Sequence, residues 1–408
     1  MTIMRTLTFM LSIFIVGMVE MVVAGIMNLM SADLNISEAW IGQLVTIYAF
    51  TFALTGPILV KLTEKYSPKS VLLSAIAFFV IGNLMIALSP NFTILIIGRI
   101  ISSAAAALIV VKILSTTVVL ARPENRGKML GIVYTGFSAS NVFGVPIGTL
   151  IGDWAGWRFT FGLIILVGLI AGVLLTIYLP KEVKSSLQPT QNHTSRILDK
   201  GEVTKLLSIT FILLTANSVA YIYINPLILS GGHNIQFVSL ALLIIGIAGM
   251  LGTSMGGFFT DKLSFKTWLL VSGGAFVIVM LVLNQLWTAS TILLIALFIW
   301  HIIQWSTNPA VQSGLIDQVE GDNSQVMSWN MSALNAGIGF GALLGGLIVS
   351  HIDLHATIYF AAGIGFIGFI IIVMLKKKAR RLDLINKDIK KGGIRHIPAY
   401  TSLFYILL

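Results

Sequence analysis

The stretch VKLTEKYSPK, at residues 60–69, has a partner 197 residues later, where residues 257–266 read GFFTDKLSFK. Both stretches place an acidic residue, a lysine, a serine and a second lysine at the same positions. Each joins two apolar segments that are long enough to cross a bilayer. Two such loops in matching settings predict a chain built from two copies of one unit.

Other matches at the same spacing support this duplication. Glu20 aligns with Asn217, and Asn28 aligns with Asn225. A row of small residues aligns as well: Gly136, Ser140, Gly144 and Gly148 with Ala333, Gly337, Gly341 and Gly345.

Composition excludes a water-soluble globular enzyme. Of the 408 residues, 56% are apolar and 10% are charged, whereas a soluble domain carries about 25% charged residues. The chain has no cysteine, so disulfides and thiolate metal sites are excluded. No phosphate-binding loop, zinc-ligand spacing or nucleophile elbow is present, and we expect no cofactor and no metal.

The apolar residues gather in segments of about 20 residues, the length that crosses a hydrocarbon core as a helix. The sequence therefore predicts an all-α membrane protein with 12 transmembrane helices in two six-helix bundles. We expect an N-terminal bundle at 1–180, a linker at 181–203, a C-terminal bundle at 204–378 and a basic tail at 379–408. The spans are predicted at 6–28, 41–62, 70–88, 92–121, 129–151, 159–179, 204–229, 237–259, 267–285, 290–313, 327–350 and 356–375.

The net charge of +10 follows from orientation in the membrane. With the N-terminus in the cytoplasm, 23 of the 26 Lys and Arg residues fall on the cytoplasmic side, and Arg99, Lys112 and Arg158 are the exceptions. This asymmetry predicts that both termini are cytoplasmic. We expect the lipid bilayer, and no nucleic acid, as the macromolecular partner.

Three stretches give the chain a family resemblance over about residues 6–378. The loop at 61–69, Arg99 in the fourth span and Gly144-Val145-Pro146-x-Gly148 in the fifth resemble motifs of the major facilitator superfamily, drug:proton antiporter branch. The loop departs from the motif, because Glu64 replaces the usual Asp while Val60 and Ser67 replace glycines. The resemblance implies a monomeric transporter in the cell membrane whose two bundles rock around a central substrate site. It also implies a cytoplasmic latch at Glu64 and Lys65 and at Asp261 and Lys262.

Within that branch, residues 17–20, 136–138 and 156–158 resemble purine base/nucleoside efflux pumps and arabinose-efflux-type permeases. The resemblance implies proton-coupled export of a small organic molecule, such as a purine, a nucleoside or a drug-like compound. A proton symporter that imports a nutrient on the same fold is one alternative. A non-transporting membrane sensor or assembly factor is another.

Glu20 is the leading candidate for proton coupling. It lies about 21 Å along the first span, at 1.5 Å per residue, and no basic residue is within helical reach in that span. A carboxylate inside the bilayer is costly unless it is paired, hydrated or protonated. Glu20 can alternatively be a structural carboxyl group bonded to neighbouring helices.

Arg99 is predicted at a similar depth and cannot lose its proton. We expect it to bias the protonation of Glu20 or to hold a substrate acceptor. The alternative is an arginine that snorkels or pins helices together.

The fifth span presents two faces. Tyr134, Phe137, Ser138 and Asn141 share one face and are predicted to line the substrate cavity. The other face carries closely spaced small residues that permit helix packing, and its counterpart is the eleventh span. The predicted packing residues are Gly136, Gly144, Pro146, Gly148, Gly337, Gly341 and Gly345.

The tenth and seventh spans supply further polar candidates. Amide groups beside flat aromatic rings suit a planar heterocycle that stacks and forms hydrogen bonds. Polar contacts between helices are the competing interpretation. The predicted substrate-binding residues here are Asn217, Tyr221, His301, Trp305, Asn308 and Gln312.

Overall fold

The computed structural model describes residues 2–122, 126–180, 196–320 and 323–376. Residues up to Met374 form one compact unit, and Leu375 begins a second one. The predicted tail at 379–408 and most of the predicted linker lie outside the described residues.

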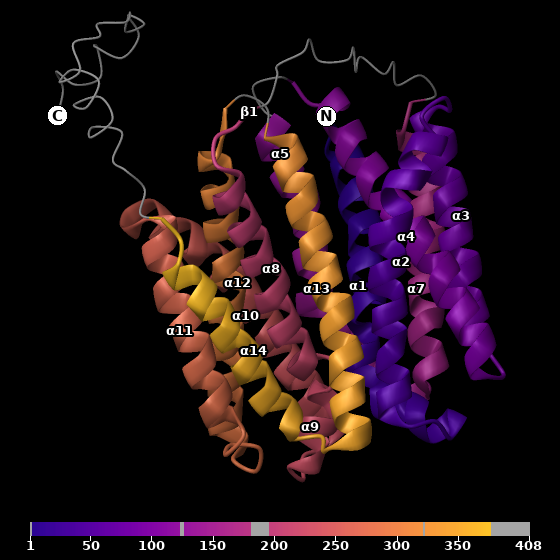
Figure 1. Ribbon diagram of the computed structural model, residues 1–408. Coiled ribbons are helices and arrows are strands. Elements are labelled where there is room, and N and C mark those ends of the chain that lie inside the picture. Colours follow the sequence, from indigo (N-terminus) through magenta and orange to yellow (C-terminus); the bar gives the residue numbers. More distant parts are fainter. Residues whose placement is uncertain (1, 123–125, 181–195, 321–322, 377–408) are drawn as a thin grey trace, which may run out of the picture. The chain divides into compact units, whose positions relative to one another are not determined.

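The described chain contains 12 helices or helix pairs that are long and apolar enough to cross a membrane, so the predicted all-α membrane fold is confirmed. We call α1–α7 the first half and α8–α14 the second half (Figure 1). The first half contains α1 (Ile3–Leu34), α2 (Glu38–Leu62), α3 (Pro68–Ala87), α4 (Phe92–Leu120), α5 (Arg126–Ala139), the π-helical turn η2 (Ser140–Gly144), α6 (Val145–Ala155) and α7 (Trp157–Tyr178). The second half contains α8 (Lys200–Tyr221), α9 (Ile224–Ser230), α10 (Ile235–Leu263), α11 (Phe265–Leu283), α12 (Ser290–Asp317), α13 (Ser324–His351) and α14 (Ala356–Val373).

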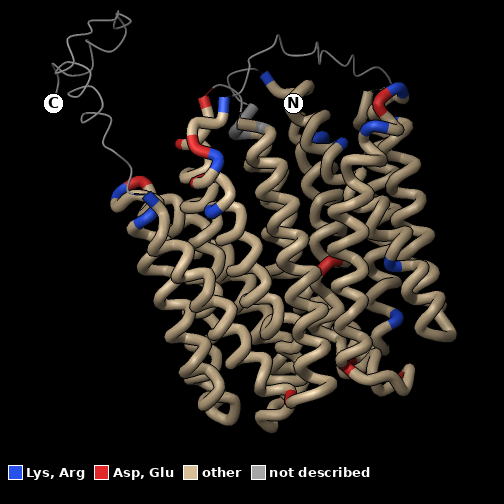
Figure 2. Tube along the Cα trace, viewed as in Figure 1, with Lys and Arg blue, Asp and Glu red and all other residues tan. Residues whose placement is uncertain are grey.

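The helices run between two ends of the unit. The proximal end carries the N-terminus and the start of α8, and the distal end carries α9 (Figure 1). Figure 2 shows that the Lys and Arg residues gather at the proximal end. At that end, the strands β1 (Arg196–Ile197) and β2 (Val319–Glu320) pair antiparallel, so the segment before α8 is joined to the α12–α13 connection.

Two prolines account for two irregular spans. Proline has no N–H for the carbonyl four residues earlier, and its ring collides with that carbonyl. For Pro146 that carbonyl belongs to Val142, inside η2. For Pro226 it belongs to Ile222, where the helix breaks between α8 and α9.

Packing contacts repeat at the spacing of 197 residues. The atoms that lie nearest to a Cβ placed on a glycine show which side chain or backbone segment that glycine packs against. In the first half α6 and the preceding turn meet α1, and in the second half α13 meets α8. The matched contacts are Gly144 on Met18 and Gly341 on Thr215, then Gly148 on Val22 and Gly345 on Val219.

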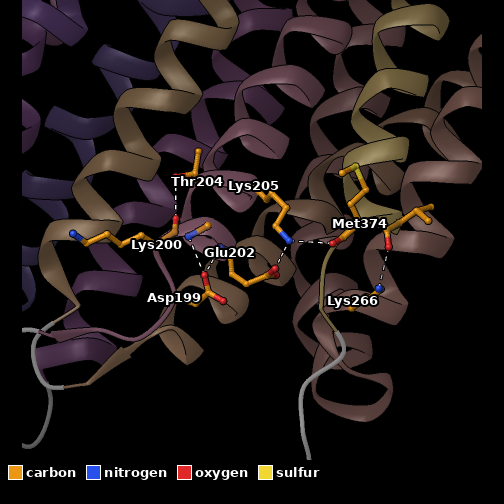
Figure 3. Close-up of polar contacts among 9 residues, drawn as sticks. Asp199, Lys200, Glu202, Thr204, Lys205, Lys266 and Met374 are labelled. Carbon is orange, nitrogen blue, oxygen red and sulfur yellow. Dashed lines mark hydrogen bonds and ion pairs between the residues drawn. The ribbon is translucent and has the colours of Figure 1, made fainter.

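Lysines cap the last helix of each half. The final carbonyls of a helix have no partner within the helix and attract cations. Lys266 donates to Val373 O at 3.1 Å and Lys205 to Met374 O at 3.0 Å, as Figure 3 shows. The equivalent of Lys266, Lys69, donates to Thr176 O at 2.6 Å. Some of the basic residues at the proximal end therefore complete helix ends.

Candidate functional site

Arg99 joins three helices of the first half. It lies fully buried in α4. Its Nη1 donates to Val19 O of α1 at 2.8 Å, and its Nε donates to Leu44 O of α2 at 3.3 Å. The guanidinium carbon lies 4.6 Å from the ring centroid of Tyr48. The structure therefore contains the helix-pinning contacts that the sequence left as an alternative.

The same cluster contains unsatisfied polar atoms. Arg99 Nη2 and the Tyr48 hydroxyl are buried without a hydrogen-bond partner among the described residues. Ser103 Oγ holds the backbone beside them, donating to Tyr48 O at 2.6 Å. Buried polar groups are nearly always paired in folded proteins, so this centre has capacity for water or a ligand.

Glu20 lies beside this cluster on α1 and is 5% exposed. It is within electrostatic reach of Arg99, Tyr48 and Tyr134. Within the described chain, no hydrogen bond or ion pair joins its carboxyl group to another residue. Glu20 can consequently gain or lose a proton without breaking a fixed contact.

Tyr134 is a partly exposed residue near this centre. It stacks on Phe137, with ring centroids 5.7 Å apart and planes 17° apart. Tyr134 lies within electrostatic reach of Glu20 and is 39% exposed. Ser138 and Asn141 continue the same stretch and are half-buried.

A second polar cluster lies in α8 and α12. The ring centroid of His301 is 5.4 Å from that of Tyr221, and Asn217 lies one helical turn before Tyr221. His301 Nε2, Asn217 Oδ1, Gln304 Oε1 and Trp300 Nε1 are all buried without a hydrogen-bond partner in the described chain. Three of the predicted residues thus come together, and Gln304 and Trp300 join them.

Other predicted residues of α12 make different contacts. Trp305 packs on α10, where a Cβ placed on Gly249 would lie 3.2 Å from Trp305 Cδ1. Gln312 Nε2 donates to Asn308 Oδ1 at 3.3 Å, so these two amides partly satisfy each other. Their direct role in substrate binding remains a prediction.

The four predicted latch residues lie at the proximal end. Glu64, Lys65, Asp261 and Lys262 are exposed. Lys262 Nζ lies 5.7 Å from the ring centroid of Phe258. A latch role for this set remains a prediction.

Among the described residues, five hydrogen bonds join the two halves, and all five lie in the distal part of the unit. Most are donated by neutral side chains to main-chain carbonyls. The five are Asn225 Nδ2 to Gly25 O at 2.6 Å, Ser239 Oγ to Pro146 O at 2.9 Å, Gln236 Nε2 to Asp153 Oδ2 at 2.7 Å, Gln43 Nε2 to Ala342 O at 3.4 Å and Tyr223 OH to Ala39 O at 3.4 Å.

Tyr223 fills a glycine-lined space within these distal contacts. It is fully buried at the break between α8 and α9. A Cβ placed on Gly345 would lie 2.7 Å from Tyr223 Cε2, and one placed on Gly346 would lie 3.0 Å from its hydroxyl. A Cβ on Gly42, in α2, would overlap that hydroxyl. The halves therefore meet here only because three positions lack side chains.

Comparison with known proteins decides the family. The Major Facilitator Superfamily matches residues 9–322 and 206–406. The chain belongs to this superfamily. It is 34% identical to an uncharacterised MFS-type transporter of Bacillus subtilis (strain 168), YbcL, over 89% of this chain and 93% of that one. A second uncharacterised MFS-type transporter of that strain, YtbD, is 30% identical over 91% and 95% of the two chains.

Solved structures agree on the fold of this transporter. A crystal structure of a D-xylose–proton symporter superposes with a TM-score of 0.75 at 14% identity, covering 92% of this chain and 98% of that one. A bacterial homologue of the human lysosomal transporter Spinster, in an inward-facing and occupied conformation, gives 0.71 at 14% identity, covering 91% and 96%. The protein is a transporter and not an enzyme.

Replacing Arg99 is expected to destabilise this transporter. Arg99→Met leaves the carbonyls of Val19 and Leu44 without their charged donor. Each such bond contributes about 1.5–3 kcal/mol, so we expect a loss of roughly 3 kcal/mol, measured as a lower thermal unfolding midpoint in detergent. Lys112→Met is the matched control in α4, because Lys112 makes one weak contact, to Thr63 O at 3.4 Å. Equal unfolding of the Arg99 variant and the wild type would contradict the helix-pinning role.

Sequence reasoning missed Tyr48, Trp300 and Tyr223. Tyr48 and Trp300 lie in apolar surroundings that resemble any core position. Tyr223 had a signal in Pro226, which lies three residues later and breaks the helix at Tyr223, and in the Gly345-Gly346 pair. A proline and paired glycines near the ends of aligned spans would have indicated a close contact there.

Proposed function

We propose that this transporter exports a small organic molecule in exchange for protons. The observation that carries the proposal is Glu20, a buried carboxyl group with a nearby positive charge and no fixed partner among the described residues. Ionisable groups inside membrane-spanning segments usually belong to ion or substrate pathways. Glu20 is accordingly assigned the proton.

The charge distribution favours a cytoplasmic proximal end, because basic residues mark the cytoplasmic side. Both termini are then cytoplasmic, in a cell membrane. The distal hydrogen bonds between the halves, including Asn225 to Gly25 O, would close the outer side. This arrangement fits a state that receives its substrate from the cytoplasm.

In the proposed cycle, Glu20 takes a proton from outside when the distal contacts open. It releases that proton inside when substrate enters the same space. One charge crossing 100 mV supplies about 2.3 kcal/mol, roughly a fortyfold concentration gradient. Arg99 would favour proton release, because a nearby cation stabilises the carboxylate.

The polar cluster of the second half supports a neutral or cationic, hydrogen-bonding substrate. Oxygens of Asn217 and Gln304 can accept, and Trp300 Nε1 can donate. Tyr134 and Phe137 offer stacked rings on the other side. A purine base or nucleoside, or a flat drug-like compound, can both form these hydrogen bonds and stack on these rings. The resemblance of this chain to the drug:proton antiporter branch points to the same classes of compound.

Two experiments test this proposal in sequence. Purified protein is first screened by thermal shift against purines, nucleosides, sugars and cationic dyes. The compound that stabilises it is then offered to proteoliposomes with an acidic lumen. Antiport accumulates the compound in the lumen, whereas symport with protons drives it out. Accumulation supports the proposal, and expulsion identifies a symporter. If the compound moves in neither direction under the pH gradient, transport of that compound is contradicted.

A further inference from the structure

A groove of about 560 Å³ lies between α2, α3 and α4, in the proximal part of the first half. Its volume falls within the usual range of ligand pockets, about 300–1,000 Å³. Tyr66 and Phe78 line it and are 66% and 59% exposed. The groove therefore opens on the outer surface of the bundle, which faces lipid in a membrane protein.

Small side chains create this groove. Ser70 and Ser74 lie one turn apart on α3, and Ala104 and Ala105 face them from α4. Farther toward the distal end the same two helices touch directly, since a Cβ placed on Gly82 would lie 2.6 Å from Ser102 N. The helices are thus fixed at one end, while their short side chains leave space at the other.

The groove has one polar end and one apolar end. Thr63, Tyr66 and Ser70 lie where α2 leads into α3, while Phe78 and Ile101 lie deeper. Lys61 and Lys65 flank Thr63 in the sequence and are exposed, and neither has a hydrogen-bond or ion-pair partner in the described chain.

The loop at residues 61–69 has a net charge of +2. It contains three lysines and one acidic residue, Glu64. Its third lysine, Lys69, donates to Thr176 O and Leu179 O of the first half, so the two free lysines carry the attraction for an anion. Basic clusters next to a membrane attract anionic headgroups.

We propose that the groove binds one acyl chain of an anionic phospholipid, whose phosphate contacts Lys61 and Lys65. A phospholipid of the proximal leaflet is polar and apolar at the same ends as the groove. Its charged headgroup would lie at the loop, and its acyl chain would extend toward the membrane centre. This inference requires only that the helices span a bilayer, and it is independent of Glu20 and of the transported compound.

The test compares phosphatidylglycerol with phosphatidylcholine by native mass spectrometry of the purified full chain. We expect the wild type to retain one phosphatidylglycerol, with at least tenfold preference over phosphatidylcholine. Ala104→Trp fills the floor of the groove and is expected to lower retention at least tenfold. Ser74→Phe fills it from the exposed rim, where folding is less at risk. Ile170→Trp, on the exposed surface of α7, is the matched control and should retain the lipid.

The headgroup contact has its own variant. Lys61→Gln with Lys65→Gln should remove the preference for phosphatidylglycerol and leave the two lipids equally retained. Wild-type retention of phosphatidylglycerol by both Ala104→Trp and Ser74→Phe would overturn the proposal. Equal retention of the two lipids by the wild type would overturn it as well.

Discussion

Glu20→Gln is expected to abolish proton-driven accumulation of substrate. In proteoliposomes with an acidic lumen, the wild type should approach a substrate gradient of about tenfold for each proton exchanged and each unit of pH difference. The variant should reach none, because a glutamine cannot release a proton. The side chain keeps nearly the same size, so the surrounding helices are expected to fold normally. Accumulation is measured with the compound found by the thermal-shift screen.

The control for this variant is Glu320→Gln, which removes an exposed carboxyl group at the proximal end. It should accumulate the compound as the wild type does. Size-exclusion chromatography establishes that both variants remain monodisperse. Full accumulation by Glu20→Gln would mean that another group carries the proton.

Gly42→Val is expected to open the distal end. Its side chain would overlap the hydroxyl of Tyr223, which is fully buried and lies close to Gly345 and Gly346. Overpacking costs about 1–3 kcal/mol, and a cost near 2 kcal/mol shifts the equilibrium roughly thirtyfold. The chain has no cysteine, so spin labels can be placed at Trp154→Cys and Ile352→Cys, two exposed distal positions in different halves.

The distance between these labels should increase in Gly42→Val and stay unchanged in Gly162→Val. A Cβ on Gly162 meets no atom within 4 Å, so this substitution adds the same volume without a clash. An unchanged label distance in Gly42→Val would show that Tyr223 does not hold the two halves together.

The repeat spacing predicted more of the structure than the helix positions. Arg158 pairs with Asp33 at the distal end. The residues 197 positions later are His355 and Ser230, and His355 Nε2 lies 3.2 Å from Ser230 Oγ. A spacing found in loop residues thus extends to contacts between helices, because both halves fold in the same way. The depth argument for Glu20 and Arg99 also gave the right neighbourhood.

The partners within that neighbourhood could not be read from the sequence. Arg99 bonds to backbone carbonyls of α1 and α2, and every residue has such a carbonyl, so no side-chain pattern marks the acceptor. The same holds for Asn225, which donates to Gly25 O. Helical periodicity indicates which residues share a face but not which helix that face meets, and Trp305 accordingly packs against α10 beside Gly249.

Proton release on substrate binding tests the central claim most directly. The compound identified by the screen is added to purified protein in weakly buffered solution containing a pH-indicator dye. The wild type is expected to release about one proton for each bound molecule, and Glu20→Gln is expected to bind the compound and release none. Equal release by both proteins, or binding to the wild type without release, would contradict the assignment of Glu20 as the proton carrier.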